Sequence, residues 1–250
     1  MLKKLLVLLL FGLGFLVAKA PASLVDGLFT RFTDGGLRLQ QAEGSLWHGR
    51  GVLASRDASG RSLSPWLPLA WDLDGSAMIR ARLSWVFSSS GTPVGRVEIG
   101  SGGLELSGLQ VRGPADAILS PIPHPLARAG WYGDLSIEAP GWSCPPSGAC
   151  TGEIRLLWRG ARAALFPDRR FGDYQVQVTA QDGQFKYSLR TLAGEVVAQG
   201  NGEAGPGRGP SFHGSIAGDP EFLSRLPAIA GGAARPTGHP GQFEIHWPPP

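Results

Sequence analysis

Apolar and polar residues alternate with a period of two along most of this chain. The alternation is clearest at residues 174–179 and 184–190. Because successive side chains of a strand point to opposite faces, this period predicts strands with one apolar and one polar face. Similar runs, often opened or closed by glycine, indicate further strands at residues 37–39, 51–54, 68–72, 77–86, 94–100, 103–108, 134–138, 152–158, 211–216 and 242–247.

Strands with one buried and one solvent-exposed face are typical of an antiparallel sheet. The runs are short and no long crossover separates them, which excludes a doubly wound α/β fold. The frequent glycines suit bulges and strong curvature. We therefore predict a mainly β fold: a curved, antiparallel, meandering sheet that folds over its own apolar concave face. Few short helices accompany it, and a membrane-anchor helix precedes it.

Two segments have a helical pattern. Residues 22–32 place Leu24, Leu28 and Phe32 at positions i, i+4 and i+8. A second helix is predicted after Asp219, which suits an N-cap and is followed by proline at the first helical position. Its apolar residues should face the sheet until Pro227 ends it; they are Phe222, Leu223 and Leu226.

Other segments are predicted to be mostly irregular. Within residues 119–129, the prolines at 121, 123 and 125 leave room for a helical turn only at residues 125–129. Glycine and proline predict loops at residues 200–210 and 231–241, and residues 248–250 form a frayed tail.

The first twenty residues predict the compartment. Lys3 and Lys4 precede an unbroken run of small and apolar residues at 5–18, and Ala-Lys-Ala follows at 18–20. The run is shorter than the ~20 residues that span a bilayer, yet Pro21 makes cleavage after Ala20 unfavourable. We predict an uncleaved signal anchor at residues 1–20, with a cleaved signal peptide as the alternative.

The anchor also predicts the orientation of the chain. Lys3 and Lys4 stay in the cytoplasm by the positive-inside rule. The remaining residues, 21–250, then form a single periplasmic β-rich domain, with a loop and tail at 231–250. The predicted location is the bacterial inner membrane, crossed once.

Composition excludes some classes of function. The net charge is +3, and Lys3, Lys4 and Lys19 account for it, leaving 20 basic and 20 acidic residues after residue 20. A domain without a basic face or run is a poor nucleic-acid binder. Eight Trp and eleven Phe argue against disorder.

Cys144 and Cys150 bracket a short Pro/Gly loop. In an oxidising compartment this pair predicts a local disulfide. The spacing is not that of a redox CxxC motif, and two cysteines without a nearby histidine do not make a zinc site.

No pattern for catalysis or a cofactor is present. The five histidines lack metal-ligand spacing, and residues 200–205 match GxGxxG only by letter, because no helix can follow them. The acidic residues are scattered singly on the polar faces of strands. We predict no catalytic, cofactor or metal site.

Tryptophan and arginine supply the candidate contact residues. Trp71, Trp85, Trp142 and Trp158 should fill the core. Trp47 lies in a tight turn between Gly44 and Gly49 and is one candidate for partner contact. Arg162, Arg169 and Arg170 are the densest basic group and would meet an acidic protein or lipid headgroups.

Several short motifs follow one another in an order that resembles the N component of the type II secretion system. Glu-Gly-Ser-Leu-Trp-His-Gly at 43–49 is similar to the family's Gly-Thr-Leu-Trp-x-Gly turn, with Ser45 in place of threonine. The resemblance covers roughly residues 5–220 and is poor after Pro227. The other motifs lie at residues 21–25, 69–73, 102–106, 130–135, 158–161, 171–174 and 200–202.

The resemblance implies an accessory, non-enzymatic subunit of the machine that exports folded proteins from the periplasm across the outer membrane. Implied partners are the inner-membrane platform and linker components and the outer-membrane secretin. Two other hypotheses about function remain. One is a lipid- or hydrophobe-binding β-groove protein of the envelope, and the other is a periplasmic enzyme such as a glycan hydrolase, which would need a polar cleft with two facing acids.

Overall fold

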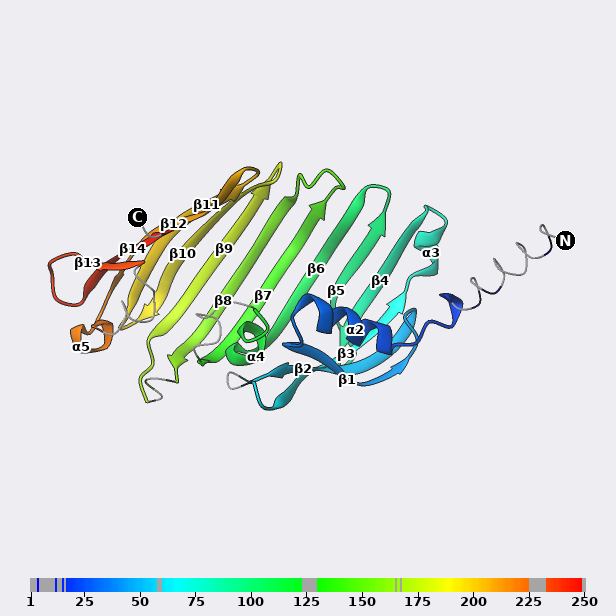
Figure 1. Cartoon of the computed structure of the whole chain (residues 1–250), viewed down its shortest axis with the longest axis horizontal. Coiled ribbons are helices and arrows are strands. Elements are labelled where there is room, and N and C mark those ends of the chain that lie inside the picture. Colours follow the sequence, from blue (N-terminus) through cyan, green and yellow to red (C-terminus); the bar gives the residue numbers. More distant parts are fainter. Residues whose placement is uncertain are drawn as a thin grey trace.

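A single antiparallel sheet dominates the computed structural model, which describes residues 4, 12, 15, 17–57, 60–122, 130–164, 166, 168–224 and 233–248. In this part of the chain the sheet has fourteen strands (Figure 1). They lie side by side in sequence order until the C-terminus, where β14 lies between β12 and β13. The prediction of a mainly β, meandering antiparallel fold with few short helices is confirmed.

The sheet is open, so its edges are β1 and β13. The strands are β1 (Leu37–Gly44), β2 (His48–Arg56), β3 (Leu63–Leu73), β4 (Arg82–Ser89), β5 (Thr92–Gly100), β6 (Gly103–Pro114), β7 (Trp131–Cys144), β8 (Thr151–Ala163), β9 (Gly172–Gln181), β10 (Gln184–Gly194), β11 (Val197–Gly205), β12 (Arg208–Ala217), β13 (Ala234–Pro236) and β14 (Gln242–Trp247). The helices are α2 (Ser23–Phe32), α3 (Gly75–Met78), α4 (Ala115–Leu119) and α5 (Pro220–Leu223).

The register of the strands places apolar residues on one face of the sheet. Leu189, Val176, Leu156, Ile137 and Val111 are paired in turn across β10, β9, β8, β7 and β6. The next row points to the opposite face and is polar throughout, consisting of Ser188, Gln177, Arg155, Glu138 and Gln110. The alternation in the sequence therefore becomes a continuous apolar concave face and a polar convex face.

Two hydrophobic cores close the concave face at its ends. At the N-terminal end, α2 packs on β1–β3 around Trp71, which is 2 % exposed. At the C-terminal end, Phe171 and Tyr174 pack with Phe243 and with Leu223 of α5, which is fully buried. Between the cores, inward residues of the central strands such as Leu106, Val111 and Ile137 are only half-buried.

The helix predicted at residues 22–32 forms as α2, but the predicted stripe is on its outer side. Leu24, Leu28 and Phe32 are 50 %, 51 % and 80 % exposed, whereas Val25 and Phe29 pack on the core. The other face was selected because Asp26 fixes the helix on β1. Asp26 accepts hydrogen bonds from Arg38 Nη2 at 2.7 Å and from the Leu39 backbone N–H at 2.8 Å.

The loop predicted at residues 200–210 is wrong, because β11 and β12 run through it and leave only a tight turn. A Cβ at Gly200 would lie 2.3 Å from Phe212 Cζ, and one at Gly202 would lie 2.1 Å from Tyr187 Cε2. These glycines are therefore strand residues on which aromatic rings lie flat.

Three smaller expectations are also corrected. Part of the loop predicted at residues 231–241 forms β13, which pairs with β14. The strand predicted at residues 77–86 begins later, at Arg82, because Asp74 caps α3 by accepting from the Ser76 backbone N–H at 3.0 Å. The helix after Asp219 forms, with the Glu221 backbone N–H donating to Asp219 Oδ1, but it ends at Leu223.

Some expectations fall outside the described residues. These are most of the predicted anchor at 1–20, the turn predicted at 125–129, and Leu226. Across the residues that are described, no helix is both long and apolar enough to span a membrane.

Candidate functional site

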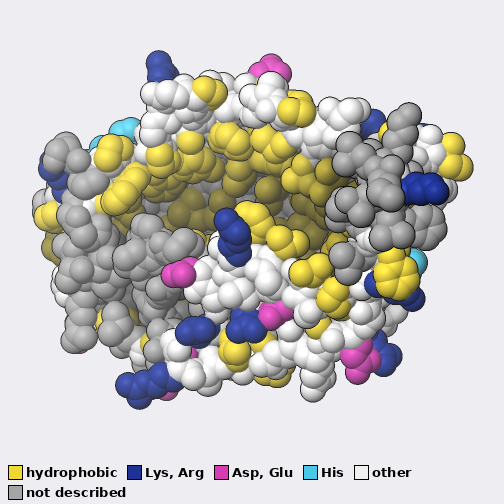
Figure 2. All heavy atoms as spheres, turned by 45° about the vertical axis from the view of Figure 1, so that its right-hand side comes forward, with side chains coloured by type: hydrophobic (Ala, Val, Ile, Leu, Met, Phe, Trp, Pro, Cys, Tyr) yellow, Lys and Arg dark blue, Asp and Glu magenta, His cyan; other side chains and the backbone are white. Residues whose placement is uncertain are grey.

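The candidate site is an apolar groove of about 390 Å³ on the concave face. Figure 2 shows it as a hollow lined by hydrophobic side chains. Strands β1–β7 supply most of the lining, Phe29 of α2 lies on one side, and α4 closes another. The lining residues are Phe29, Leu37, Leu53, Trp66, Leu67, Leu69, Phe87, Val94, Gly95, Val97, Leu106, Leu109, Val111, Ala117, Ile118, Pro121 and Ile137.

The groove follows from the strand register. Phe87 pairs with Gly95, and Val97 pairs with Leu106, so alternate residues of β4, β5 and β6 point to the same side. None of the lining residues is charged, and none has a side-chain hydroxyl, amide or carboxylate. The groove is therefore suited to bury hydrocarbon, and its lining supplies no acid, base or nucleophile.

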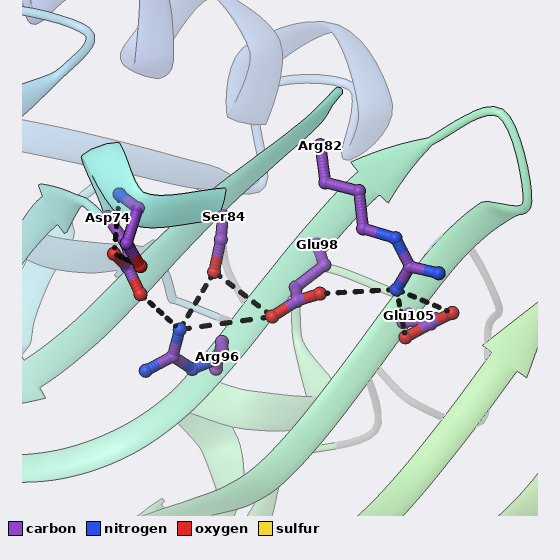
Figure 3. A network of polar contacts seen from close by, with 7 residues as sticks. Asp74, Arg82, Ser84, Arg96, Glu98 and Glu105 are labelled. Atoms are coloured by element: carbon purple, nitrogen blue, oxygen red, sulfur yellow. Dashed lines mark hydrogen bonds and ion pairs between the residues drawn. The ribbon is translucent and has the colours of Figure 1, made fainter. Parts of the chain in front are cut away.

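Charged residues of the same strands alternate with the groove residues and so point to the opposite face. Four of them, Arg82, Arg96, Glu98 and Glu105, lie in one network of polar contacts (Figure 3). Arg96 Nη1 lies 2.8 Å from Asp74 Oδ2 and 3.0 Å from Ser84 Oγ. Arg82 Nη1 lies 3.5 Å from Glu98 Oε2 and 3.3 Å from Glu105 Oε2. An arginine therefore stands between the two glutamates, and the arrangement is an ion-pair network that ties β4, β5 and β6 together.

Asp74 at the edge of this network is held ionised. Hydrogen bonds from Ser76 and then from Arg96 lower the pKa of Asp74 to about 2. A carboxylate with so low a pKa stays charged at any physiological pH and cannot act as a general acid there.

Trp47 belongs to a turn that fastens the start of the chain to the sheet. Its indole stacks on Trp85 with ring centres 6.3 Å apart, and its Nε1 donates to the Val17 carbonyl at 3.0 Å. The Leu46 backbone N–H donates to the Ala20 carbonyl at 2.8 Å. Trp47 therefore contacts this chain's own N-terminal segment, and its role in partner contact stays a prediction.

Trp71 holds the other side of the same turn. Its Nε1 lies 3.1 Å from the Ser45 carbonyl and 3.2 Å from the Leu46 carbonyl, and Trp85 Nε1 also donates to Leu46. A Cβ at Gly49 would lie 2.3 Å from the Trp71 ring. The Gly-Ser-Leu-Trp-His-Gly motif therefore needs its second glycine so that Trp71 can lie across the strand.

Two of the three candidate arginines pair with acids of this chain. Arg169 Nη2 lies 2.8 Å from Asp219 Oδ2, and Arg170 Nη2 lies 2.8 Å from Asp173 Oδ1. Arg162 is exposed on β8. Two of the three therefore bind acids of their own chain, and a common partner contact for them stays a prediction.

The disulfide between Cys144 and Cys150 is present and joins the end of β7 to the loop before β8. This confirms the predicted pairing. It closes the connection between two of the longest strands at one end of the central part of the sheet.

One close pair was missed by the sequence analysis. His213 Nδ1 lies 2.9 Å from His246 Nδ1 across β12 and β14. Their separation of 33 residues carries no motif, so only the strand register could have paired them. Among the described residues, no three histidines, cysteines or acids gather as a metal would require.

Comparisons with known proteins give one result. The family described as Type II secretion system (T2SS), protein N matches residues 35–239. No curated protein and no solved structure matches the chain. The match starts after the predicted anchor and continues past Pro227, where the resemblance in sequence motifs had ended. Since it covers most of the chain, this protein belongs to the type II secretion system protein N family.

Proposed function

We propose that this chain is an accessory, non-enzymatic subunit of the type II secretion system that acts from the periplasmic side of the inner membrane. The observation that carries the proposal is the family match over residues 35–239. Its partners would be the inner-membrane platform and linker components, together with the outer-membrane secretin.

Two structural features support this proposal. The Cys144–Cys150 disulfide suits an oxidising compartment such as the periplasm. The groove lining carries no ionisable group, and the facing acids Glu98 and Glu105 are both bound to Arg82 on the other face. A glycan hydrolase would instead need two free facing carboxylates in a polar cleft.

The test is an in-frame deletion with plasmid complementation. Exoproteins are measured separately in the culture supernatant and in the periplasm. We expect the deletion strain to accumulate exoproteins in the periplasm and the full-length chain to restore their release. Unchanged release from the deletion strain would contradict a required role in secretion.

The predicted anchor has its own test. Membranes are washed with carbonate, and the N-terminus of the protein is determined by mass spectrometry. We expect the protein to stay with the membranes and to retain residues 1–20. A mature chain that begins at Pro21 would show that the segment is a cleaved signal peptide.

A second complementing plasmid supplies residues 21–250 behind a cleavable signal peptide. Restoration equal to that of the full-length chain would show that the anchor serves only to bring the domain into the periplasm. We expect weaker restoration, because tethering raises the local concentration of the domain beside its membrane partners.

A further inference from the structure

We infer that the concave groove holds one acyl chain of a bilayer phospholipid. This goes beyond a subunit role. It rests on the proposed membrane placement of the chain, but not on its part in secretion. The lining is apolar, the indole N–H of Trp66 being bound to Ser55 Oγ, and Phe29 of α2 forms part of its wall.

The chemistry of the lining excludes an extended peptide. A peptide strand carries a backbone donor and acceptor at each residue, and each must find a partner when buried. Groups buried without a partner cost about 1–3 kcal/mol each. The groove offers side chains without such partners, and its strands already pair with each other. An acyl chain has no polar group to satisfy along its length.

The size of the groove is that of a small-molecule site. Its volume of about 390 Å³ falls within the range of about 300–1,000 Å³ that is usual for such sites. A narrow, flexible apolar ligand therefore fits the groove.

The position of α2 favours a membrane lipid as the source of the acyl chain. Phe29 faces the groove, while Leu24, Leu28 and Phe32 on the outer side are at least half exposed. A helix with such an apolar outer face is suited to lie in a membrane interface. The apolar run at residues 5–18 ends just before this helix, and Trp47 binds the carbonyl of Val17.

These contacts place one wall of the groove beside the point at which the predicted anchor leaves the bilayer. A phospholipid chain could then move from the bilayer past α2 into the groove without crossing water. The headgroup would stay outside, since the lining holds no cation to receive it.

The experiment uses the full chain in proteoliposomes of phosphatidylethanolamine. A trace of the lipid carries a diazirine within one acyl chain. After irradiation and trypsin digestion, labelled positions are read by mass spectrometry. Residues 97–112 form one tryptic peptide, which contains four lining residues, Val97, Leu106, Leu109 and Val111.

We expect labels in this peptide at the lining positions and not at Glu98, Glu105 or Gln110, which point to the convex face. Labels confined to residues 1–32 would show contact with the bilayer alone and would overturn the inference. So would equal labelling of inward and outward positions in the peptide.

A matched pair of variants sharpens the test. Val111→Trp fills the groove, whereas Gln110→Trp adds the same ring to the exposed face of the same strand. We expect Val111→Trp to remove most of the label from residues 97–112 and Gln110→Trp to leave it unchanged. Leu106→Trp serves as a second filling variant, and circular dichroism checks that each variant keeps its sheet.

Unchanged labelling in both well-folded filling variants would overturn the inference. The two proposals can also fail separately. A chain that is labelled in the groove but dispensable for secretion leaves the lipid site standing, and a required chain without groove labelling leaves only the secretion role.

Discussion

The closed ends of the sheet and its open centre are built from the same alternating pattern. At the N-terminal end, α2 covers the inward residues, so Leu39 and Trp71 are almost fully buried. In the centre, the inward residues Leu106 and Val111 are half-buried and face the groove. The comparison teaches that alternation decides which face is apolar, whereas the covering elements decide whether that face is a core or a binding surface.

The largest expected effect is at the closed N-terminal end. Trp71→Ala removes a buried ring and its hydrogen bonds to the turn at Ser45 and Leu46, and should cost about 3–5 kcal/mol of unfolding free energy. Urea unfolding measures this cost. Trp47→Ala, at a half-buried ring, is the control and should cost clearly less. Equal losses would mean that burial does not distinguish the two sides of the turn.

Two leucines test the comparison directly. Leu39→Ala in the core should cost about 2–5 kcal/mol, because Leu39 is 5 % exposed. Leu106→Ala in the groove should cost about half as much, since less apolar area leaves water there on folding. Urea unfolding of both variants gives the ratio. If Leu106→Ala proves as costly as Leu39→Ala, the centre is a closed core and the groove is not a site.

The disulfide stabilises one end of the central strands, whose apolar side chains are less buried than those of the two cores. Replacing Cys144 and Cys150 by serine removes a cross-link over six residues and should cost about 2 kcal/mol through the greater freedom of the unfolded chain. The loss should appear in thermal unfolding as a lower midpoint. Adding a reductant should lower the midpoint of the natural protein equally and leave that of the serine variant unchanged.

The smallest effect concerns the attachment of α2. Hydrogen bonding from Arg38 and from the Leu39 backbone keeps the pKa of Asp26 below its usual 3.8. The stabilisation is therefore complete above pH 3.8 and is lost as pH falls through the lower pKa of the folded state. A partly exposed pair of this kind contributes about 1 kcal/mol.

Hydrogen exchange at residues 23–32 measures how firmly α2 is attached. Asp26→Asn should weaken protection there at neutral pH and remove its loss in acid. Identical acid profiles for the variant and the natural protein would assign the pH dependence to another group.

The sequence was sufficient to predict the strands of the fold but not how they are covered. Residues 174–179 and 184–190 alternate without exception and form β9 and β10. In contrast, Gly200 and Gly202 resemble loop residues until the rings of Phe212 and Tyr187 are seen to lie on them. That contact depends on neighbouring strands and is invisible in a local pattern.

The sequence could predict that the concave face is apolar, but not where the groove opens on it. An apolar concave face follows from the alternation, but the position of its opening depends on how α2 is attached. The spacing of Leu24, Leu28 and Phe32 predicted the helix but not which of its sides packs on the sheet. That side is the one from which Asp26 binds Arg38 of β1. Twelve residues separate the two partners, and no short motif records their pairing.

The almost unbroken sequence order of the strands has a consequence for how the protein is made. Every strand from β2 to β12 pairs with the one made just before it, so each hairpin can form as soon as its second strand emerges. Such short-range pairing keeps the entropy of loop closure small. A chain that is threaded through a membrane from its N-terminus can therefore assemble this sheet progressively, and only β13 must wait for β14, its later neighbour.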